Sequence, residues 1–167
     1  MWPTSFEKSA KKMVEKFVLD CSVAAKWYLF YEDEVDLARK ILLQYLAGQI
    51  EFHAPDLLKY ELTNALTKAR RTRRLRLSNK QSESSFRSFC ELEIKFHSLP
   101  DSALAEAVAF SNQFYRSFFD SCYLWLAERL DCPWLTADRK FQGPHPLGFP
   151  AHRIRFLSSF HPKTENE

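Results

Sequence analysis

Short apolar runs alternate along the chain with segments whose apolar residues recur every three or four positions. The short runs predict buried strands, and the segments with the longer period predict helices that bury one face. Strands are predicted at 17–19, 50–54, 92–96, 134–136 and 154–157. Helices are predicted at 23–30, 35–47, 56–69, 78–90, 100–114 and 120–130.

Strands separated by helices predict an α/β fold. We expect a three-layer sandwich with a central, mainly parallel sheet flanked by helices. Segment 92–96 alternates apolar and polar residues, which is typical of an edge strand with one solvent-exposed face. We expect a single domain over 17–158, an N-terminal arm over 1–16 and a C-terminal tail over 159–167. Ligands of such sheets bind beyond the carboxyl ends of the strands, where the strand order reverses.

Composition narrows the class of protein. Hydrophobic residues make up 46% of the chain and only 3 residues are Gly, which excludes a disordered protein. No apolar run approaches the roughly 20 residues of a membrane helix, so we expect no membrane contact. The 4 cysteines and 5 histidines show no zinc-site spacing. Three of the cysteines lie in apolar segments, and we expect a reduced, cytoplasmic protein.

Four acidic residues stand where apolar segments end or at the margin of an apolar helix face: Asp20, Glu61, Asp120 and Asp138. Asp20 and Asp138 both follow predicted strands, and they would face each other if those strands are neighbours at the switch point. Two carboxylates roughly 4 Å apart repel by about 4 kcal/mol at an effective dielectric near 20. Such a cluster therefore needs protons or a divalent cation, and the cation is the simpler interpretation.

Each of these acids also has a purely structural interpretation. Asp20 followed by Ser22 is typical of a helix N-cap after a strand, and Asp120 would cap the helix that it opens. Glu61 can be a surface side chain beside an apolar stripe, and Asp138 an ordinary loop aspartate. The joint placement of the four on one side of the predicted sheet favours a common site.

A cluster of basic residues follows at the end of the predicted helix 56–69. Cations near a helix C-terminus complement the helix dipole, but this cluster has more basic residues than that role requires. It suits RNA phosphates or an acidic segment of a partner protein, although a solvated face remains the alternative. The formal net charge is only +3, and the cluster comprises Lys68, Arg70, Arg71, Arg73, Arg74 and Arg76.

Four stretches of sequence carry a resemblance to a known family. They are FVLDCSVAAKW, HAPDLLKYELTNAL, FFDSCYLWLAERL and CPWLTADRKF, in that order over 17–141. Together they resemble the PIN-domain ribonucleases, and most of all the VapC type of toxin from toxin–antitoxin pairs. The N-terminal arm is longer than is usual for that type.

The resemblance implies a function and a site. It implies that Asp20, Glu61, Asp120 and Asp138 form an acidic metal site for Mg²⁺ or Mn²⁺ and cleave RNA phosphodiester bonds. It further implies a homodimer and a small antitoxin protein that blocks the site. The residues expected to support the four acids are Ser22, Asn64 and Thr136.

Two other functions remain open. A non-catalytic PIN-like module would use the basic cluster to bind RNA or a protein. A phosphoryl-transfer enzyme would use Asp20 as its nucleophile, but such enzymes commonly carry a second aspartate two residues on, where this chain has Ser22. If the acids do cluster, neutralising one of them, as in Asp138→Asn, is expected to stabilise the metal-free protein.

Overall fold

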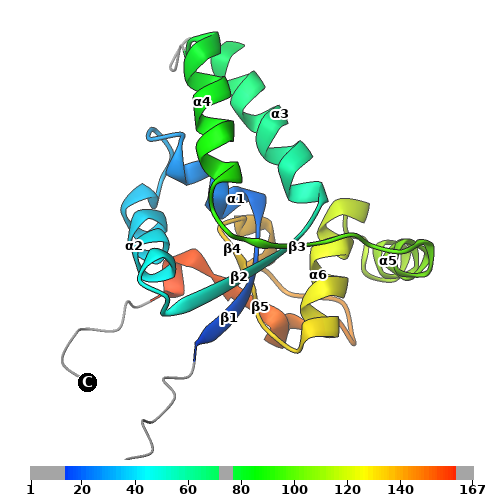
Figure 1. Cartoon of the computed structure of the whole chain (residues 1–167). Coiled ribbons are helices and arrows are strands. Elements are labelled where there is room, and N and C mark those ends of the chain that lie inside the picture. The colour runs from blue at the N-terminus through cyan, green and yellow to red at the C-terminus, as the bar shows by residue number, and fades with distance from the viewer. Residues whose placement is uncertain (1–13, 72–76, 161–167) are drawn as a thin grey trace, which may run out of the picture.

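The computed structural model describes residues 14–71 and 77–160. Its described strands form one parallel sheet with the order β3-β2-β1-β4-β5, which confirms the predicted fold class (Figure 1). Strand β3 lies at an edge, as its alternating pattern predicted. The strands are β1 (Glu15–Leu19), β2 (Ile50–Pro55), β3 (Lys95–His97), β4 (Trp134–Thr136) and β5 (Ile154–Phe156).

Helices cover both faces of the sheet, and the pairing register shows which face each one takes. Neighbouring residues of a strand point to opposite faces. Phe52 of β2 packs against Tyr45 on one face, whereas Trp134 of β4 stacks on Tyr123 on the other. The α-helices are α1 (Cys21–Ala24), α2 (Val35–Leu46), α3 (Leu57–Arg71), α4 (Asn79–Cys90), α5 (Asp101–Phe114) and α6 (Phe118–Leu130).

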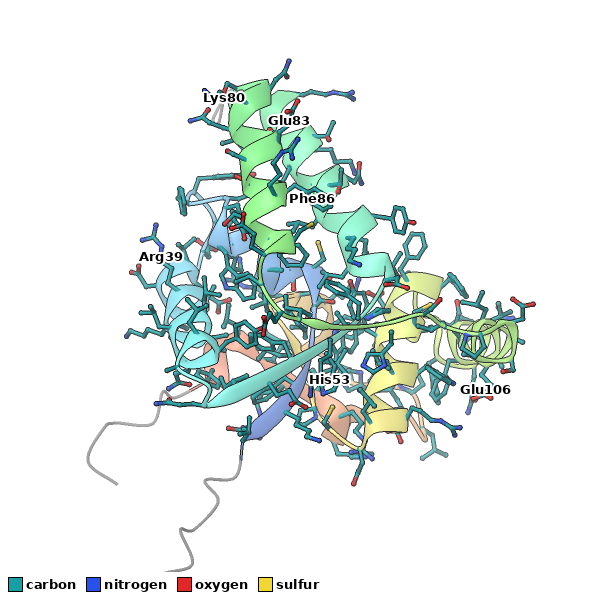
Figure 2. The ribbon with its side chains drawn as sticks, viewed as in Figure 1. Arg39, His53, Lys80, Glu83, Phe86 and Glu106 are labelled. Atoms are coloured by element: carbon teal, nitrogen blue, oxygen red, sulfur yellow. The ribbon has the colours of Figure 1, made fainter. Side chains whose placement is uncertain are left out.

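Helices α3 and α4 lie side by side and project away from the sheet (Figure 1). Lys80 and Glu83 lie toward the far end of α4, beyond Phe86 (Figure 2). Short 3₁₀ segments complete the fold: η1 (Ala25–Trp27), η2 (Arg139–Phe141), η3 (Ala151–Arg153) and η4 (Leu157–Ser159). Over the described ranges, no helix combines the length and the apolar character needed to cross a membrane.

Several predicted boundaries are wrong in detail. The predicted helix 23–30 is replaced by the short helix α1 and by η1, because apolar period alone does not separate α from 3₁₀ geometry. Helix α6 begins before Asp120, and its N-cap is Ser117, whose hydroxyl accepts a hydrogen bond from the Asp120 amide at 3.1 Å. Phe119 is 51% exposed and is not part of the buried face of that helix.

The predicted arm and tail lie mostly outside the described residues. Strand β1 begins at Glu15, inside the segment assigned to the arm. At the other end, Phe160 packs edge-on against Phe17 with ring centroids 6.3 Å apart. The domain boundaries at 17–158 therefore stay a prediction.

Candidate active site

Topology brings the ends of β1 and β4 together. The two strands are neighbours, and β1 also pairs with β2 on its other side, so the strand order reverses between β1 and β4. Asp20 directly follows β1, and its amide donates to the Leu135 carbonyl of β4 at 3.0 Å. Asp138 stands two residues after β4. Both carboxylates therefore lie at the carboxyl edge of the sheet, where parallel α/β folds bind ligands.

The Asp20 carboxylate is held by surrounding donors. It is only 7% exposed, and its Oδ2 accepts hydrogen bonds from the amide of Ser22 at 2.9 Å and from the Ser22 hydroxyl. Its Oδ1 accepts from the indole Nε1 of Trp134 at 3.1 Å. Burial raises the pKa of Asp20, and the hydrogen bonds from Ser22 oppose that rise. The predicted N-cap role of Asp20 and its place in the site are thus compatible.

Two hydroxyl groups connect Asp20 to the segment that carries Asp138. The Ser22 hydroxyl accepts from the Ala137 amide at 2.9 Å. The Thr136 hydroxyl donates to Asp20 Oδ2 at 3.3 Å and accepts from the Asp138 amide at 3.1 Å. Ser22 and Thr136 therefore bond the end of β1 to the segment after β4. Their role in supporting a metal site stays a prediction.

Glu61 lies on the second turn of α3 and reaches the same region from the side. Its Oε2 accepts a hydrogen bond from the Tyr123 hydroxyl of α6. Burial raises the pKa of Glu61 to about 7, and the charges of Asp20 and Asp120 add to that rise. The ring of Tyr123 stacks on the ring of Trp134, with centroids 5.8 Å apart. Because Tyr123 bonds to Glu61 and Trp134 bonds to Asp20, the stacked rings connect the two acids.

A lysine joins the remaining two acids. The Nζ of Lys140 lies 2.9 Å from Asp120 Oδ2 and 2.9 Å from Asp138 Oδ2. Burial lowers the pKa of Lys140, but its bonds to Asp120 and Asp138 outweigh that effect and the pKa is raised. Asp120 also accepts from the Ser117 hydroxyl at 2.6 Å.

The four predicted acids thus form one group of interacting charges, which we call the acidic group: Asp20, Glu61, Asp120 and Asp138. Asn64, the third predicted supporting residue, is exposed one turn beyond Glu61. Within the described part of the chain, no hydrogen bond joins the Asn64 side chain to the acidic group.

Sequence reasoning missed three residues of the site. Trp134 and Tyr123 lie in a predicted strand and a predicted helix, and both are buried. The signal for them is that a buried indole N–H or phenol O–H needs a polar partner. Lys140 was not singled out. Its signal is its position two residues after Asp138, in a turn where the Lys140 amide donates to Asp138 Oδ1 at 3.0 Å.

The donor atoms of the acidic group suit a hard cation. Carboxylate and hydroxyl oxygens are the ligands that Mg²⁺ prefers. The thiols of Cys21 and Cys122 lie near Asp20 and Glu61, but burial raises the pKa of both, so they stay protonated and do not favour zinc. As they stand, no three His, Cys, Asp or Glu side chains in residues 14–71 and 77–160 are arranged to hold a metal ion. A cation nevertheless fits between Asp120 and Asp138, because the Lys140 ammonium lies there.

The basic cluster is only partly described. Lys68 and Arg71 are exposed on the last turns of α3, and Arg70 belongs to the same helix. From Glu61 to Lys68 the helix rises by roughly 10 Å. The basic cluster therefore begins roughly 10 Å from Glu61, along the α3–α4 pair that projects from the sheet (Figure 1). The predicted residues Arg73, Arg74 and Arg76 lie outside the described residues.

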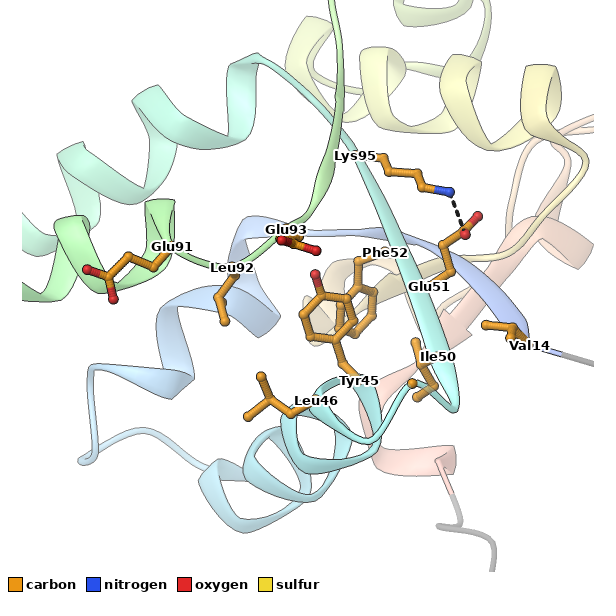
Figure 3. Close-up of a pocket in the computed structure, with 11 residues that line it drawn as sticks. Val14, Tyr45, Leu46, Ile50, Glu51, Phe52, Glu91, Leu92, Glu93 and Lys95 are labelled. Atoms are coloured by element: carbon orange, nitrogen blue, oxygen red, sulfur yellow. Dashed lines mark hydrogen bonds and ion pairs between the residues drawn. The ribbon is translucent and has the colours of Figure 1, made fainter. Parts of the chain in front are cut away.

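Two of the cavities in the described surface differ in their relation to the acidic group. A groove of about 490 Å³ between the α1–α2 connection and Asp138 opens beside the acidic group, with Lys26, Glu32 and Arg139 among its lining residues. A second cavity, of about 480 Å³, lies between α2, β2 and the α4–β3 connection (Figure 3). None of the acidic group lines that second cavity.

Solved structures share this fold. VapBC2 from Rickettsia felis, bound to a DNA fragment from its promoter, is 13% identical with a TM-score of 0.58, over 84% of this chain and 98% of that chain. A toxin–antitoxin complex from Klebsiella pneumoniae is 16% identical with a TM-score of 0.56, over 84% and 97%. Mycobacterium tuberculosis VapC20, described as a sarcin-ricin loop cleaving toxin, is 11% identical with a TM-score of 0.56, over 79% and 100%.

Sequence comparison identifies the family. No curated protein matches the sequence significantly. The family model for the PIN domain matches residues 17–143, which includes each member of the acidic group and most of the chain. The chain therefore belongs to the PIN domain family.

Proposed function

We propose that this protein is a metal-dependent endoribonuclease and the toxin of a toxin–antitoxin pair. The observation that carries the proposal is the acidic group, assembled from residues 20 to 138 at the switch point of a PIN domain sheet. The structural neighbours include a toxin described as cleaving the sarcin-ricin loop and two toxin–antitoxin assemblies, which supports both the activity and the partner.

The acidic group would hold Mg²⁺ or Mn²⁺ together with phosphate oxygens of RNA. A bound dication supplies a water of lowered pKa and stabilises charge on the reacting phosphate. Asp20 is already oriented by Ser22, Thr136 and Trp134, so it loses little freedom when it binds a cation. We assign direct ligation first to Asp20 and Asp138.

Glu61 has the properties of a proton acceptor. In the metal-free protein burial raises its pKa to about 7, and a bound dication would lower that pKa, so Glu61 would be ready to accept a proton at neutral pH. The Tyr123 hydroxyl donates to its Oε2, and no donor among residues 14–71 and 77–160 bonds its Oε1, which would orient a water. Asp120 would complete the site at the start of α6, held by Ser117.

An RNA cleavage assay tests this function. Wild-type protein should cleave RNA in Mg²⁺ or Mn²⁺ and not in excess chelator. Asp20→Asn should lower the cleavage rate by at least about a hundredfold, because a metal ligand is lost. Circular dichroism of the variant should match that of the wild type. Undiminished cleavage by Asp20→Asn, or by the wild type in chelator, contradicts the proposal. RNA binding without turnover under every metal condition favours the non-catalytic module.

The predicted homodimer needs an apolar surface outside the acidic group. Exposed apolar side chains gather on α3, α5 and α6, where Tyr60 is 75% and Val108 49% exposed. A pocket of about 230 Å³ lies among them. We place the contact with a second copy on this surface. Light scattering should show a dimer for the wild type and for the control Leu43→Asp on α2, and a monomer for Val108→Asp. A monomeric wild type contradicts the homodimer.

A further inference from the structure

Lys140 occupies the space that a cation shared by Asp120 and Asp138 would need. Its Nζ lies 2.9 Å from one oxygen of each carboxylate. Asp120 and Asp138 would hold a dication through the same carboxylate oxygens that now accept hydrogen bonds from this ammonium. The ammonium and a dication at that position therefore exclude each other, since both would stand within a few ångströms of the same oxygens.

The lysine is free to leave without disturbing the core. Its side chain is 46% exposed, and the ammonium lies 5.0 Å from the face of the Phe141 ring. An ion pair as exposed as that of Lys140 with Asp138, whose side chains are 46% and 36% exposed, contributes little to stability. The backbone stays in place meanwhile, because the Lys140 amide donates to Asp138 Oδ1 at 3.0 Å.

We propose that Lys140 is an exchangeable counter-cation: it neutralises Asp120 and Asp138 until a dication binds, and then contacts the RNA phosphate beside the cleaved bond. The second step rests on the function proposed above. Lysine suits it, because its compact charge sits on a flexible four-carbon stem and offers three donors to phosphate oxygens. Because the Lys140 amide bonds to the Asp138 carboxylate, the lysine side chain would reach a phosphate bound beside Asp138.

Three variants separate this role from a general charge effect. Lys140→Met removes the ammonium and keeps the stem, and Lys140→Arg keeps the charge. Arg139→Gln is the matched control, because it removes the same charge one residue away. Arg139 is 67% exposed on its side chain and pairs with Asp33 at 3.2 Å instead of with the acidic group.

The first measurement is Mn²⁺ binding without RNA, by calorimetry. Loss of the competing ammonium should make Lys140→Met bind Mn²⁺ about three- to tenfold more tightly than the wild type. Arg139→Gln should stay within about twofold. Equal or weaker Mn²⁺ binding by Lys140→Met overturns the exchange. If the wild type still binds Mn²⁺ and cleaves RNA in that case, the proposed function stands while this inference fails. A wild type that binds no Mn²⁺ overturns both.

The second measurement is RNA cleavage in saturating Mn²⁺. Loss of one phosphate contact should raise the KM of Lys140→Met for RNA about tenfold, with a smaller change in kcat. The slope of log affinity against log salt concentration should fall by about the amount that one phosphate contact contributes. Lys140→Arg should recover most of the KM. An unchanged KM in Lys140→Met overturns the phosphate contact.

Discussion

At the scale of single residues, burial sets the protonation of the acidic group. The pKa of Glu61 is raised from 4.5 to about 7, chiefly by burial. Between these two values the folded protein keeps a proton that the unfolded chain has lost. The contribution of Glu61 to the free energy of unfolding therefore falls as pH rises from about 4.5 to 7, and the full cost of the buried charge remains above 7.

Glu61→Gln should remove this pH dependence. In chelator at pH 8, the variant should be more stable than the wild type by about 1–2 kcal/mol, a figure reduced for the partial exposure of Glu61. This difference in the free energy of unfolding should shrink toward pH 5, where Glu61 is protonated in the folded wild type. Urea unfolding of both proteins from pH 5 to 8 measures it. A difference that is the same at every pH would show that the burial of a charged Glu61 is not its cause.

Asp138→Asn, unlike Glu61→Gln, should not stabilise the metal-free protein, contrary to the expectation from the sequence. From the sequence, neutralising one of the clustered acids, as in Asp138→Asn, is expected to stabilise the metal-free protein. Lys140 already offsets the charge of Asp138, so its neutralisation removes an ion pair instead of relieving repulsion. Urea unfolding in chelator should show Asp138→Asn less stable than the wild type by about 0–1 kcal/mol. A clear stabilisation would mean that repulsion still dominates at Asp138.

At the scale of elements, the start of α6 positions Asp120. Ser117 caps the helix and its hydroxyl also donates to the Asp120 carboxylate at 2.6 Å. Ser78 caps α4 in a capping box with Gln81 and touches none of the acidic group. The two serines thus share a structural role and differ in their relation to the site.

Ser117→Ala and Ser78→Ala should each lower the free energy of unfolding by about 1 kcal/mol, because each helix loses its cap. Only Ser117→Ala should weaken Mn²⁺ binding, by up to about tenfold, since a hydrogen bond that orients a ligand is lost. Urea unfolding and Mn²⁺ calorimetry on both variants measure these effects. Equal Mn²⁺ affinities in the two variants would remove Ser117 from the site.

The elements also show how far sequence alone reaches. Apolar runs gave the strands and the edge position of β3, and the βα alternation placed Asp20 and Asp138 at one edge of the sheet. Capping chemistry was misassigned at Asp120, because Ser117 and Asp120 are both good caps three residues apart. The bonds of Lys140 could not be predicted, since they depend on a turn that brings its side chain back toward α6.

At the scale of the whole molecule, the fold holds together acids that are far apart in sequence. Repulsion within the acidic group is offset in part by Lys140, by protonation of Glu61 and by the donors around Asp20. A ligand that binds the folded protein but not the unfolded chain raises the melting temperature.

Mg²⁺ should therefore stabilise the protein as a whole. At a concentration about a hundredfold above its dissociation constant, a bound ion adds about 2.7 kcal/mol to the free energy of unfolding. The melting temperature of the wild type should rise as Mg²⁺ is added, and that of Asp20→Asn should rise much less. Differential scanning calorimetry follows both. The same rise in the two proteins would place the binding of Mg²⁺ elsewhere.

On the proposed function, Asp20, Glu61, Asp120 and Asp138 bind one hard dication at the switch point of the sheet, through at least two of their carboxylates. Anomalous diffraction from crystals grown in Mn²⁺ tests it most directly. We expect a manganese peak within about 2.5 Å of oxygens from at least two of these four carboxylates. A peak at other residues, or none at this edge of the sheet in crystals saturated with Mn²⁺, would contradict it.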